Sequence, residues 1–330
     1  MPSPEIVFDT LFAYQRSAAL KAAIDLEVFT AIDEGAQTAA GIAKKSGSAE
    51  RGIRILCDYL TIIGLLTKPD GAYQLTPDTA AFLSKNSPMY FGTVAQFLTL
   101  PEMKKNFDGL TETVRRGGVA PTGNTVADEN PIWVEFARSM VPMMLPAGHA
   151  IAGMVADPAA GAIKVLDIAA GHGMFGVIIA QHNPKAEVVA VDWAPVLKVA
   201  EENARAAGVE SRYKTAPGDA FKVDFGTGYD VVLVPNFLHH FDHATCTTFL
   251  KKCHAALKTG GRVVVVEFVP NADRVSPPMA AGFSLTMLAG TPAGDAYTMA
   301  ELEKQLRDAG FNNISAHALP TPETILLAQK

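Results

Sequence analysis

The sequence has few cysteines, only two tryptophans and no excess of positive charge. Its three cysteines, Cys57, Cys246 and Cys253, are too few and too scattered for a disulfide framework or a zinc knuckle. A net charge of −6 argues against a large nucleic-acid surface, because an acidic protein repels phosphates. The chain also lacks an apolar run long enough to span a bilayer, and its start, MPSPEIVFDT, has no features of a signal peptide. We therefore expect a soluble, cytoplasmic globular protein.

The chain divides into two parts with different residue patterns, and the pattern of the first part is helical. Helical spacing of Ala and Leu covers residues 8–32, and Thr38 is placed to open a short helix over 38–46. A longer helix is expected from residue 49 and ends at Gly64. The stretch LLTKPDGAYQLT then predicts two strands around a turn at residues 69–71. Helices followed by a hairpin are the pattern of a winged helix, which we assign to residues 1–110.

A winged helix usually suggests DNA binding. The helix that would enter the groove carries Arg51 and Arg54, but also Glu50 and Asp58, and is otherwise largely apolar. Such a face binds phosphates poorly, so we expect this domain to bind protein.

The pattern of the second part, residues 111–330, predicts strands that alternate with helices. Strands are expected at 164–170, 186–192, 212–218, 229–236 and 262–269, and helices at about 174–182, 195–207, 244–257 and 299–309. Near-continuous Val, Ile and Leu runs of this kind are typical of a buried parallel sheet. The tail predicts two strands around a turn at 320–322, and segments 115–131 and 270–296 read as loops. The predicted fold is α/β: a Rossmann-like, mostly parallel sheet with a C-terminal antiparallel hairpin. A mainly helical winged-helix domain precedes it in the sequence.

The stretch KVLDIAAGHGMFG, residues 164–176, runs from the first of these strands into a G-x-G-x-x-G loop. Asp192, at the end of the next strand, lies where a ribose-binding acid is expected. This much suits both NAD and S-adenosylmethionine (SAM). Asp167 favours SAM, because a carboxylate opposes a pyrophosphate but attracts a sulfonium and an ammonium group. The run Gly218-Asp219-Ala220-Phe221 also offers a carboxylate and a ring to an adenine.

The order VLDIAAGHG, AVDWAPV, GDAF, GYDVVLVPNFLHHF, LKTGGRVVVVE and AYTMAELEKQLRDAGF resembles the class I SAM-dependent methyltransferases. With the N-terminal winged helix, the chain is similar to the small-molecule O-methyltransferases that include plant caffeic acid and bacterial polyketide enzymes. The resemblance implies a homodimer whose N-terminal domains close each other's pockets, a small aromatic acceptor, and S-adenosylhomocysteine (SAH) as product. It implies these cofactor-binding residues: Asp167, Gly171, Gly173, Asp192, Trp193, Gly218, Asp219, Ala220, Phe221 and Asn236.

The stretch that follows the fourth strand of this sheet is rich in histidine. A phenol must lose its proton to attack a methyl group, and histidine suits that task at neutral pH. By resemblance His239 is the base, Glu267 orients it, and His240 replaces a family acid. Which of the two histidines takes the proton stays open, and His239 and His243 have a helical zinc spacing without a third ligand, so we expect no metal.

Trp133, Phe136 and Met140 lie in a run dense in aromatic and methionine residues, and with Met287 they are the expected substrate pocket. One departure from the family is Ala296, which stands where a second glutamate is common, and Asp295 beside it is a candidate substitute. Because of this departure, N- or C-methylation and a different use of SAM stay open as hypotheses. Two more hypotheses are a winged-helix regulator that binds DNA and senses SAM, and an NAD-dependent dehydrogenase.

Overall fold

The computed structural model describes residues 2–120 and 130–330 and divides after Pro101 into two compact units, each described here by itself. The second unit begins at Glu102, whereas the sequence pattern places the start of the second domain at residue 111. Helix α9 (Leu110–Arg116), which follows α8 (Pro101–Asp108), packs on α15 (Pro278–Gly290) and so belongs with the second unit. Within the described residues, no helix combines the length and hydropathy that crossing a bilayer requires.

The first unit is a helical cluster with a small two-stranded sheet. Its elements are α1 (Glu5–Leu11), α2 (Ala13–Asp25), α3 (Val28–Asp33), α4 (Ala39–Ser46), α5 (Glu50–Ile62), β1 (Leu66–Thr67), η1 (Pro69–Gly71), β2 (Gln74–Leu75), α6 (Pro77–Leu83) and α7 (Val94–Leu98). The expected start of α4 is confirmed, because the Thr38 hydroxyl accepts a hydrogen bond from the Gly41 N–H at 3.1 Å. Strands β1 and β2 pair in antiparallel fashion, as the hairpin prediction requires.

Two basic side chains in the winged-helix region, Arg54 and Lys68, are paired within the unit. The carboxylate of Asp58 binds the guanidinium of Arg54 at 3.0 Å and the ammonium of Lys68 at 2.6 Å. It also accepts a hydrogen bond from the buried Tyr73 hydroxyl at 2.7 Å. One carboxylate thus offsets part of the charge of these two cations, which weakens the attraction of this face for phosphates.

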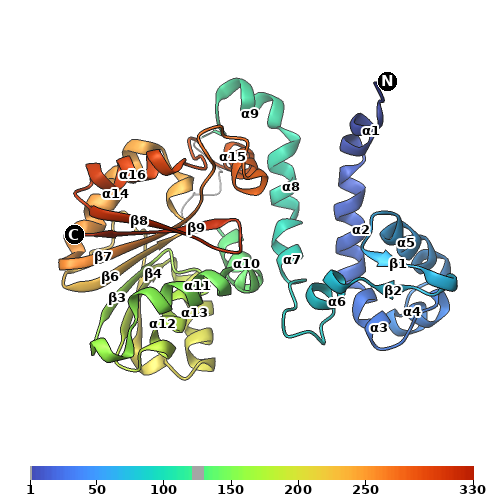
Figure 1. The fold of residues 1–330 in the computed structure, drawn as a ribbon, viewed down its shortest axis with the longest axis horizontal. Coiled ribbons are helices and arrows are strands. Elements are labelled where there is room, and N and C mark those ends of the chain that lie inside the picture. The colour runs from blue at the N-terminus through green and yellow to red at the C-terminus, as the bar shows by residue number, and fades with distance from the viewer. Residues whose placement is uncertain (1, 121–129) are drawn as a thin grey trace. The chain divides into compact units, whose positions relative to one another are not determined.

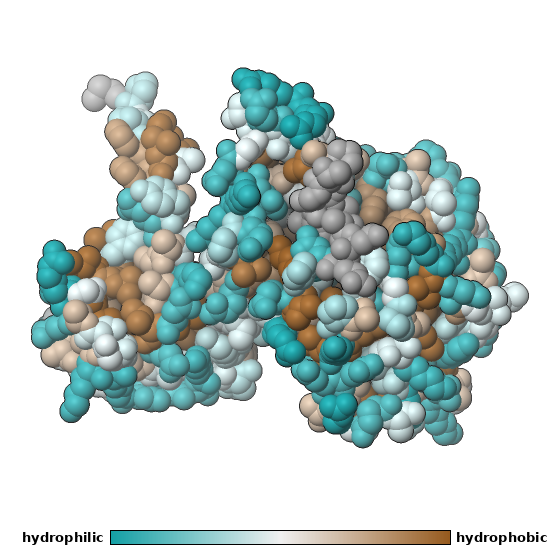
Figure 2. Space-filling view, turned by 180° about the vertical axis from the view of Figure 1, so that it is seen from behind, coloured by the Kyte–Doolittle hydropathy of each residue, from teal (hydrophilic) through white to brown (hydrophobic). Residues whose placement is uncertain are grey.

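Helix α1 and the start of α2 expose a row of large apolar side chains (Figure 2). No residue of α1 is buried. The exposed set comprises Ile6, Val7, Phe8, Leu11, Phe12 and Tyr14. An apolar row of this density on a surface helix is typical of a contact with another protein surface.

The second unit is a seven-stranded sheet with helices on both faces (Figure 1). Its further elements are α10 (Ile132–Ser139), α11 (Val141–Val155), η2 (Pro158–Ala160), β3 (Lys164–Ile168), α12 (Met174–His182), β4 (Glu187–Asp192), α13 (Ala194–Ala206), η3 (Glu210–Arg212), β5 (Tyr213–Pro217), β6 (Tyr229–Pro235), η4 (Leu238–His240), α14 (His243–Ala256), β7 (Leu257–Phe268), α16 (Met299–Asp308), β8 (Asn312–Ala318) and β9 (Glu323–Gln329). Helices α11, α12 and α13 lie on one face, and α14 and α16 on the other (Figure 1).

The strand order is β5-β4-β3-β6-β7-β9-β8, with β3 to β7 parallel and β9 antiparallel to both of its neighbours. The predicted parallel sheet and closing hairpin are therefore confirmed. From β3 the chain continues to β4 and β5 on one side of β3 and then returns to β6 on the other side. The switch point of the sheet is therefore at the carboxyl ends of β3 and β6. Ligands of open α/β sheets bind at this point.

The expectation of a loop over 270–296 is wrong, because that segment contains α15. Its 13 residues are rich in Ala, Met and Leu, all good helix formers, and Pro278 occupies the first helical position, which Pro favours. Of the other expected loop, residues 115 and 116 end α9, and residues 121–129 lie outside the described part of the chain.

Candidate active site

The glycine loop after β3 is held in a left-handed backbone that glycine makes accessible. Gly171 and Gly173 have φ values of 57° and 72°. A Cβ atom on Gly173 would lie 2.5 Å from the Tyr213 hydroxyl and 2.7 Å from the Ala200 Cβ, so no side chain fits there. The loop leads directly into α12, and the His172 Nδ1 accepts a hydrogen bond at 3.0 Å from the N–H of Met174, the first residue of that helix.

Asp192 is fixed against this loop. Its Oδ2 accepts a hydrogen bond from the Gly171 N–H at 2.8 Å, and its Oδ1 accepts one from the Trp193 N–H at 2.7 Å. Burial raises the pKa of Asp192 to about 6, and these two backbone bonds oppose the increase. Each oxygen keeps a further lone pair, so the carboxylate is still able to accept ribose hydroxyls.

Asp167 is completely buried beneath the loop. Its Oδ2 accepts a hydrogen bond from the Gly176 N–H at 3.1 Å, whereas its Oδ1 has no hydrogen-bond partner among the described residues. Burial raises the pKa of this carboxyl to about 8, with the backbone bond opposing the increase. An unpartnered buried acid beside a nucleotide-type loop fits a cofactor that carries a cationic group, as SAM does.

The Gly218–Phe221 turn, which the sequence predicts to bind adenine, lies one strand further along the sheet. The Gly218 N–H donates to the Asp192 carbonyl at 2.9 Å, which brings the Gly218–Phe221 turn next to Asp192. The Asp219 Oδ1 accepts from the Phe221 N–H at 2.8 Å, and its Oδ2 pairs with the Lys222 ammonium at 3.0 Å. Phe221 and the small residue Ala220 are half-buried, and the Phe221 ring packs on other phenylalanine rings.

The two catalytic candidates form one buried pair. Glu267 Oε2 lies 2.5 Å from His239 Nδ1, and the two side chains are 2% and 5% exposed. Glu267 Oε1 accepts hydrogen bonds from three consecutive backbone N–H groups, those of Phe237, Leu238 and His239, at 3.2, 2.8 and 3.3 Å. A carboxylate fixed by three backbone N–H groups also orients the imidazole, with the Nδ1 proton toward Glu267.

His240 lies beside this pair, with its ring centre 4.3 Å from that of His239. Its Nδ1 is buried and has no partner among the described residues. Burial, followed by the neighbouring His239, holds the pKa of His240 well below its usual range. His240 is therefore neutral at physiological pH, which suits a hydrogen-bonding role better than proton removal.

Aromatic and imidazole rings continue on both sides of the histidine pair. Trp133 meets His240 edge-on at 5.3 Å and Phe136 at 5.7 Å, and Phe136 stacks on His172 of the glycine loop. On the other side the Phe283 ring stands perpendicular to His239 at 4.9 Å. Phe283 also stacks on Phe268 at 4.1 Å. The structure thus brings Trp133 and Phe136, two of the predicted pocket residues, next to the histidines.

The sequence prediction did not include Phe268 and Phe283. Phe268 directly follows Glu267, and Phe283 lies one helical turn before Met287, a spacing that points to Phe283 only once α15 is known to be a helix. Met140 and Met287 are both buried. Asn236 has a left-handed φ of 52°, and its side-chain N–H donates to the Met144 sulfur at 3.3 Å while its Oδ1 has no partner among the described residues.

The segment that holds Ala296 packs on the histidines through its backbone. Ala296 is fully buried, and a Cβ on Gly294 would lie 2.2 Å from the His239 carbonyl oxygen. The carboxylate of Asp295 pairs with the Arg274 guanidinium at 3.1 Å on the surface. Asp295 is thus committed to Arg274, and the idea that it substitutes for the missing glutamate receives no support from its contacts.

His243 points to a different partner from His239, because its Nδ1 lies 3.2 Å from the amide nitrogen of Gln305. In the described part of the chain, no three His, Cys, Asp or Glu side chains are grouped as a metal site would need.

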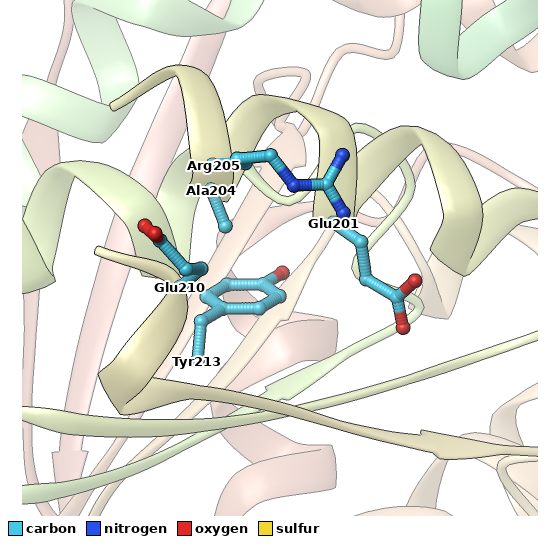
Figure 3. A pocket seen from close by; sticks show the side chains of 5 residues that line it. All are labelled: Glu201, Ala204, Arg205, Glu210 and Tyr213. Carbon is cyan, nitrogen blue, oxygen red and sulfur yellow. The ribbon is translucent and has the colours of Figure 1, made fainter. Parts of the chain in front are cut away.

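A pocket of about 200 Å³ opens behind the glycine loop, between α13 and the start of β5. Figure 3 shows its lining of Glu201, Ala204, Arg205, Glu210 and Tyr213. Tyr213 reaches the glycine loop with its buried hydroxyl and lines the pocket with its ring, so it lies between this surface pocket and the loop.

Comparison with known proteins agrees with this geometry. The O-methyltransferase domain matches residues 151–312, and the O-methyltransferase dimerisation domain matches residues 8–85. A solved structure from Nostoc punctiforme PCC 73102, provisionally assigned as an O-methyltransferase, is 51% identical over the whole of both chains with a TM-score of 0.95. Solved structures of the same fold include complexes with SAM and with SAH.

Two curated Streptomyces enzymes are each 28% identical to this chain. The 3-hydroxy-5-methyl-1-naphthoate 3-O-methyltransferase of Streptomyces sahachiroi aligns over 97% of this chain and 92% of its own length. The L-tyrosine C(3)-methyltransferase of Streptomyces lavendulae aligns over 97% and 91%. With the glycine loop, the acids beside it and the match over both domains, the chain belongs to the SAM-dependent O-methyltransferases of small molecules.

Proposed function

We propose that this enzyme transfers the methyl group of SAM to a hydroxyl on a flat aromatic acceptor, with His239 as the general base. The observation that carries the proposal is the buried His239–Glu267 pair at 2.5 Å, set between aromatic rings at the carboxyl end of the sheet. Rings on both sides suit a planar acceptor, because offset and edge contacts between rings are favourable.

His239, Glu267 and His240 each have a separate role in the proposed methyl transfer. Bound SAM supplies an electrophilic methyl group on a good leaving group, so the protein mainly has to position and deprotonate the acceptor. Glu267 keeps the Nδ1 proton of His239 in place, which leaves Nε2 free to accept the acceptor's proton. The imidazolium that results is stabilised by the same carboxylate, and the neutral His240 beside it orients the acceptor by a hydrogen bond.

The cofactor site follows from the glycine loop. We propose that Asp167, Gly171 and Gly173 face the methionine part of SAM, that Asp192 and the adjoining Trp193 and Asn236 surround the ribose region, and that the turn from Gly218 through Asp219, Ala220 and Phe221 holds the adenine. Titration with SAH by calorimetry tests this: binding is expected for the parent and a large loss for Asp192→Ala, with NAD as the negative ligand. Binding of NAD in place of SAH would contradict the assignment.

The acceptor assignment has its own experiment. Purified enzyme is incubated with SAM and 2-naphthol, a phenol of the ring size in the naphthoate relative's name, or with L-tyrosine, and the products are fragmented by mass spectrometry. Methylation on oxygen that disappears in His239→Ala supports the proposal. A methyl group on carbon would favour the second candidate, C-methylation, which the tyrosine relative and the alanine at position 296 motivate.

We further propose that the enzyme is a homodimer that associates through its N-terminal unit. The match to the dimerisation domain and the exposed apolar row on α1 and α2 support this.

A further inference from the structure

Glu323 is a buried acid that the mechanism above does not use. It is 2% exposed, and neither of its carboxyl oxygens has a hydrogen-bond partner among the described residues. Thr321, two residues earlier in the hairpin turn, places its hydroxyl near this carboxyl without forming a hydrogen bond of normal geometry. Burial raises the pKa of Glu323 above its usual value, an effect that the nearby Thr321 hydroxyl opposes. An uncompensated buried carboxyl costs stability, so its presence calls for a group that completes it.

The register of the sheet places Glu323 on the acceptor side. Glu323 lies directly opposite Phe268 in the antiparallel β7–β9 pair, so both side chains project from the same face. Phe268 stacks on Phe283, and Phe283 contacts His239. Glu267, the neighbour of Phe268, projects from the opposite face.

Three other residues with unpartnered polar atoms, Asp167, Asn236 and His240, lie at the same end of the sheet, and the proposed function assigns them to cofactor and acceptor. Apart from Thr321, the remaining such atoms in the described chain, on Tyr213 at the start of β5 and on His243 and Gln305 of α14 and α16, are not at this edge. Glu323 begins β9, which runs antiparallel, so its position is at that same edge. These unsatisfied groups therefore outline one ligand site, and Glu323 is its most distant member from the glycine loop along the strand order.

We propose that Glu323 determines acceptor specificity by binding a hydrogen-bond-donating group, an ammonium or a hydroxyl, at the end of the acceptor away from the methylated oxygen. The inference rests on the proposed function for the position of the acceptor. An acceptor with a carboxylate at that end, such as a naphthoate, should bind poorly, because Glu323 would repel it.

The test measures binding to the SAH-loaded enzyme and therefore needs no turnover. The probes are tyramine, 4-(2-hydroxyethyl)phenol, 4-propylphenol and 3-(4-hydroxyphenyl)propanoate, which share a phenol and differ at the far end. The parent is expected to bind tyramine or the hydroxyethyl phenol about tenfold to a hundredfold more tightly than 4-propylphenol, and the propanoate more weakly still. Glu323→Leu is expected to remove this preference while 4-propylphenol binds as before, and Glu323→Gln to keep the preference for the hydroxyl probe.

Stability gives an independent readout without any acceptor. Glu323→Leu is expected to raise the melting temperature, because it removes an uncompensated buried carboxyl. Glu187→Leu is the matched control: Glu187 also begins a strand of this sheet but is exposed, and this change should move neither readout.

A lower melting temperature of Glu323→Leu would overturn the proposal, since the carboxyl would then be a structural partner. Equal binding of all probes by the parent, a preference that survives in Glu323→Leu, or no binding of any probe would overturn it too. Failure of the proposed function has a different signature, namely absence of His239-dependent methyl transfer with SAH binding and probe preference intact.

Discussion

Glu267 holds His239 at two points, by its imidazole Nδ1 through Oε2 and by its backbone N–H through Oε1. One carboxylate thus sets both the ring orientation and the course of the short η4 helix that carries the ring. His239 and Glu267 therefore form a single structural unit. Replacing His239 should affect catalysis alone, whereas replacing Glu267 should affect both catalysis and folding stability.

Replacing the base should abolish chemistry and spare binding. His239→Ala is expected to lower kcat by about 100-fold to 10,000-fold, because general base catalysis is worth that much. SAH affinity should stay within about twofold, since the ring of His239 contacts Glu267, His240 and Phe283 and these are assigned to the acceptor side. The measurement is SAH production under saturating SAM, with His243→Ala as the control at a histidine bound elsewhere. Equal losses in both variants would argue against a base at position 239.

Replacing the supporting carboxylate should disturb both chemistry and folding. In Glu267→Gln an amide N–H that faces His239 would force Nδ1 to accept, so the proton moves to Nε2 and the base is blocked. We expect kcat to fall about 100-fold or more and the unfolding free energy to fall by about 1–3 kcal/mol, because three backbone N–H groups lose a charged acceptor. Chemical denaturation and single-turnover kinetics measure the two effects. A stable, fully active variant would contradict this role of Glu267.

Cofactor binding should release a proton at neutral pH. Asp167, with a pKa of about 8, is largely protonated at pH 7, and an adjacent ammonium group of SAH favours its charged form. Calorimetry in buffers of different ionisation enthalpy should show release of up to about one proton at pH 7, and less above about pH 9. Asp167→Asn removes the titrating group and should show no release.

The same group gives the apo enzyme a pH dependence of stability. Because its folded pKa is above the unfolded value of 3.8, the folded chain binds more protons between about pH 4 and about 8. This contribution to stability is therefore full below about pH 4 and is lost as the pH rises toward about 8. Asp167→Asn should flatten that part of the melting profile, and an unchanged slope would contradict the prediction.

The close approach of residue 294 to the base leaves no room for a methyl group. In Gly294→Ala the Cβ would meet the His239 carbonyl oxygen at 2.2 Å, so the backbone of one segment must move. We expect a loss of several degrees in melting temperature and of most activity. The matched control is Gly282→Ala in α15, where a Cβ meets nothing within 4 Å and Ala should stabilise the helix by about 0.5–1 kcal/mol.

The N-terminal apolar row should be required for association. Leu11, which is 64% exposed, is expected to lie in a dimer contact, and Leu11→Glu should shift the mass measured by light scattering toward the monomer. Ile62→Glu replaces another exposed apolar residue of the same unit and should leave the dimer intact. A parent protein that is monomeric at micromolar concentration would rule out the dimer.

Much of the second unit could be predicted because its patterns are local. The valine-rich runs at 188–191 and 263–266 indicate strands buried in a sheet that is covered on both faces. The glycines at 171 and 173 mark a turn whose left-handed backbone other residues rarely adopt. His239 and Glu267 came from the resemblance, and their hydrogen bond is a property of the fold that no spacing in the sequence reveals.

The features that the sequence did not predict depend on contacts between segments that are distant in the chain. Phe283 of α15 reaches His239, and Phe268 of β7 stacks on Phe283. The tight contact of Gly294 is visible only once residues 291–298 lie against η4. The helix at 278–290 was missed because its apolar residues show no single face, and packing on α9 and β7 stabilises it in place of an amphipathic pattern.

Strand β7 delivers Glu267 to one face of the sheet and Phe268 to the other, in consecutive positions. Substitutions at position 268 can therefore alter the acceptor side without touching the support of the base. An insertion or deletion of a single residue in this strand is different, because it would exchange the two side chains between faces. The length of β7 should therefore tolerate change less well than the identity of the residue at position 268.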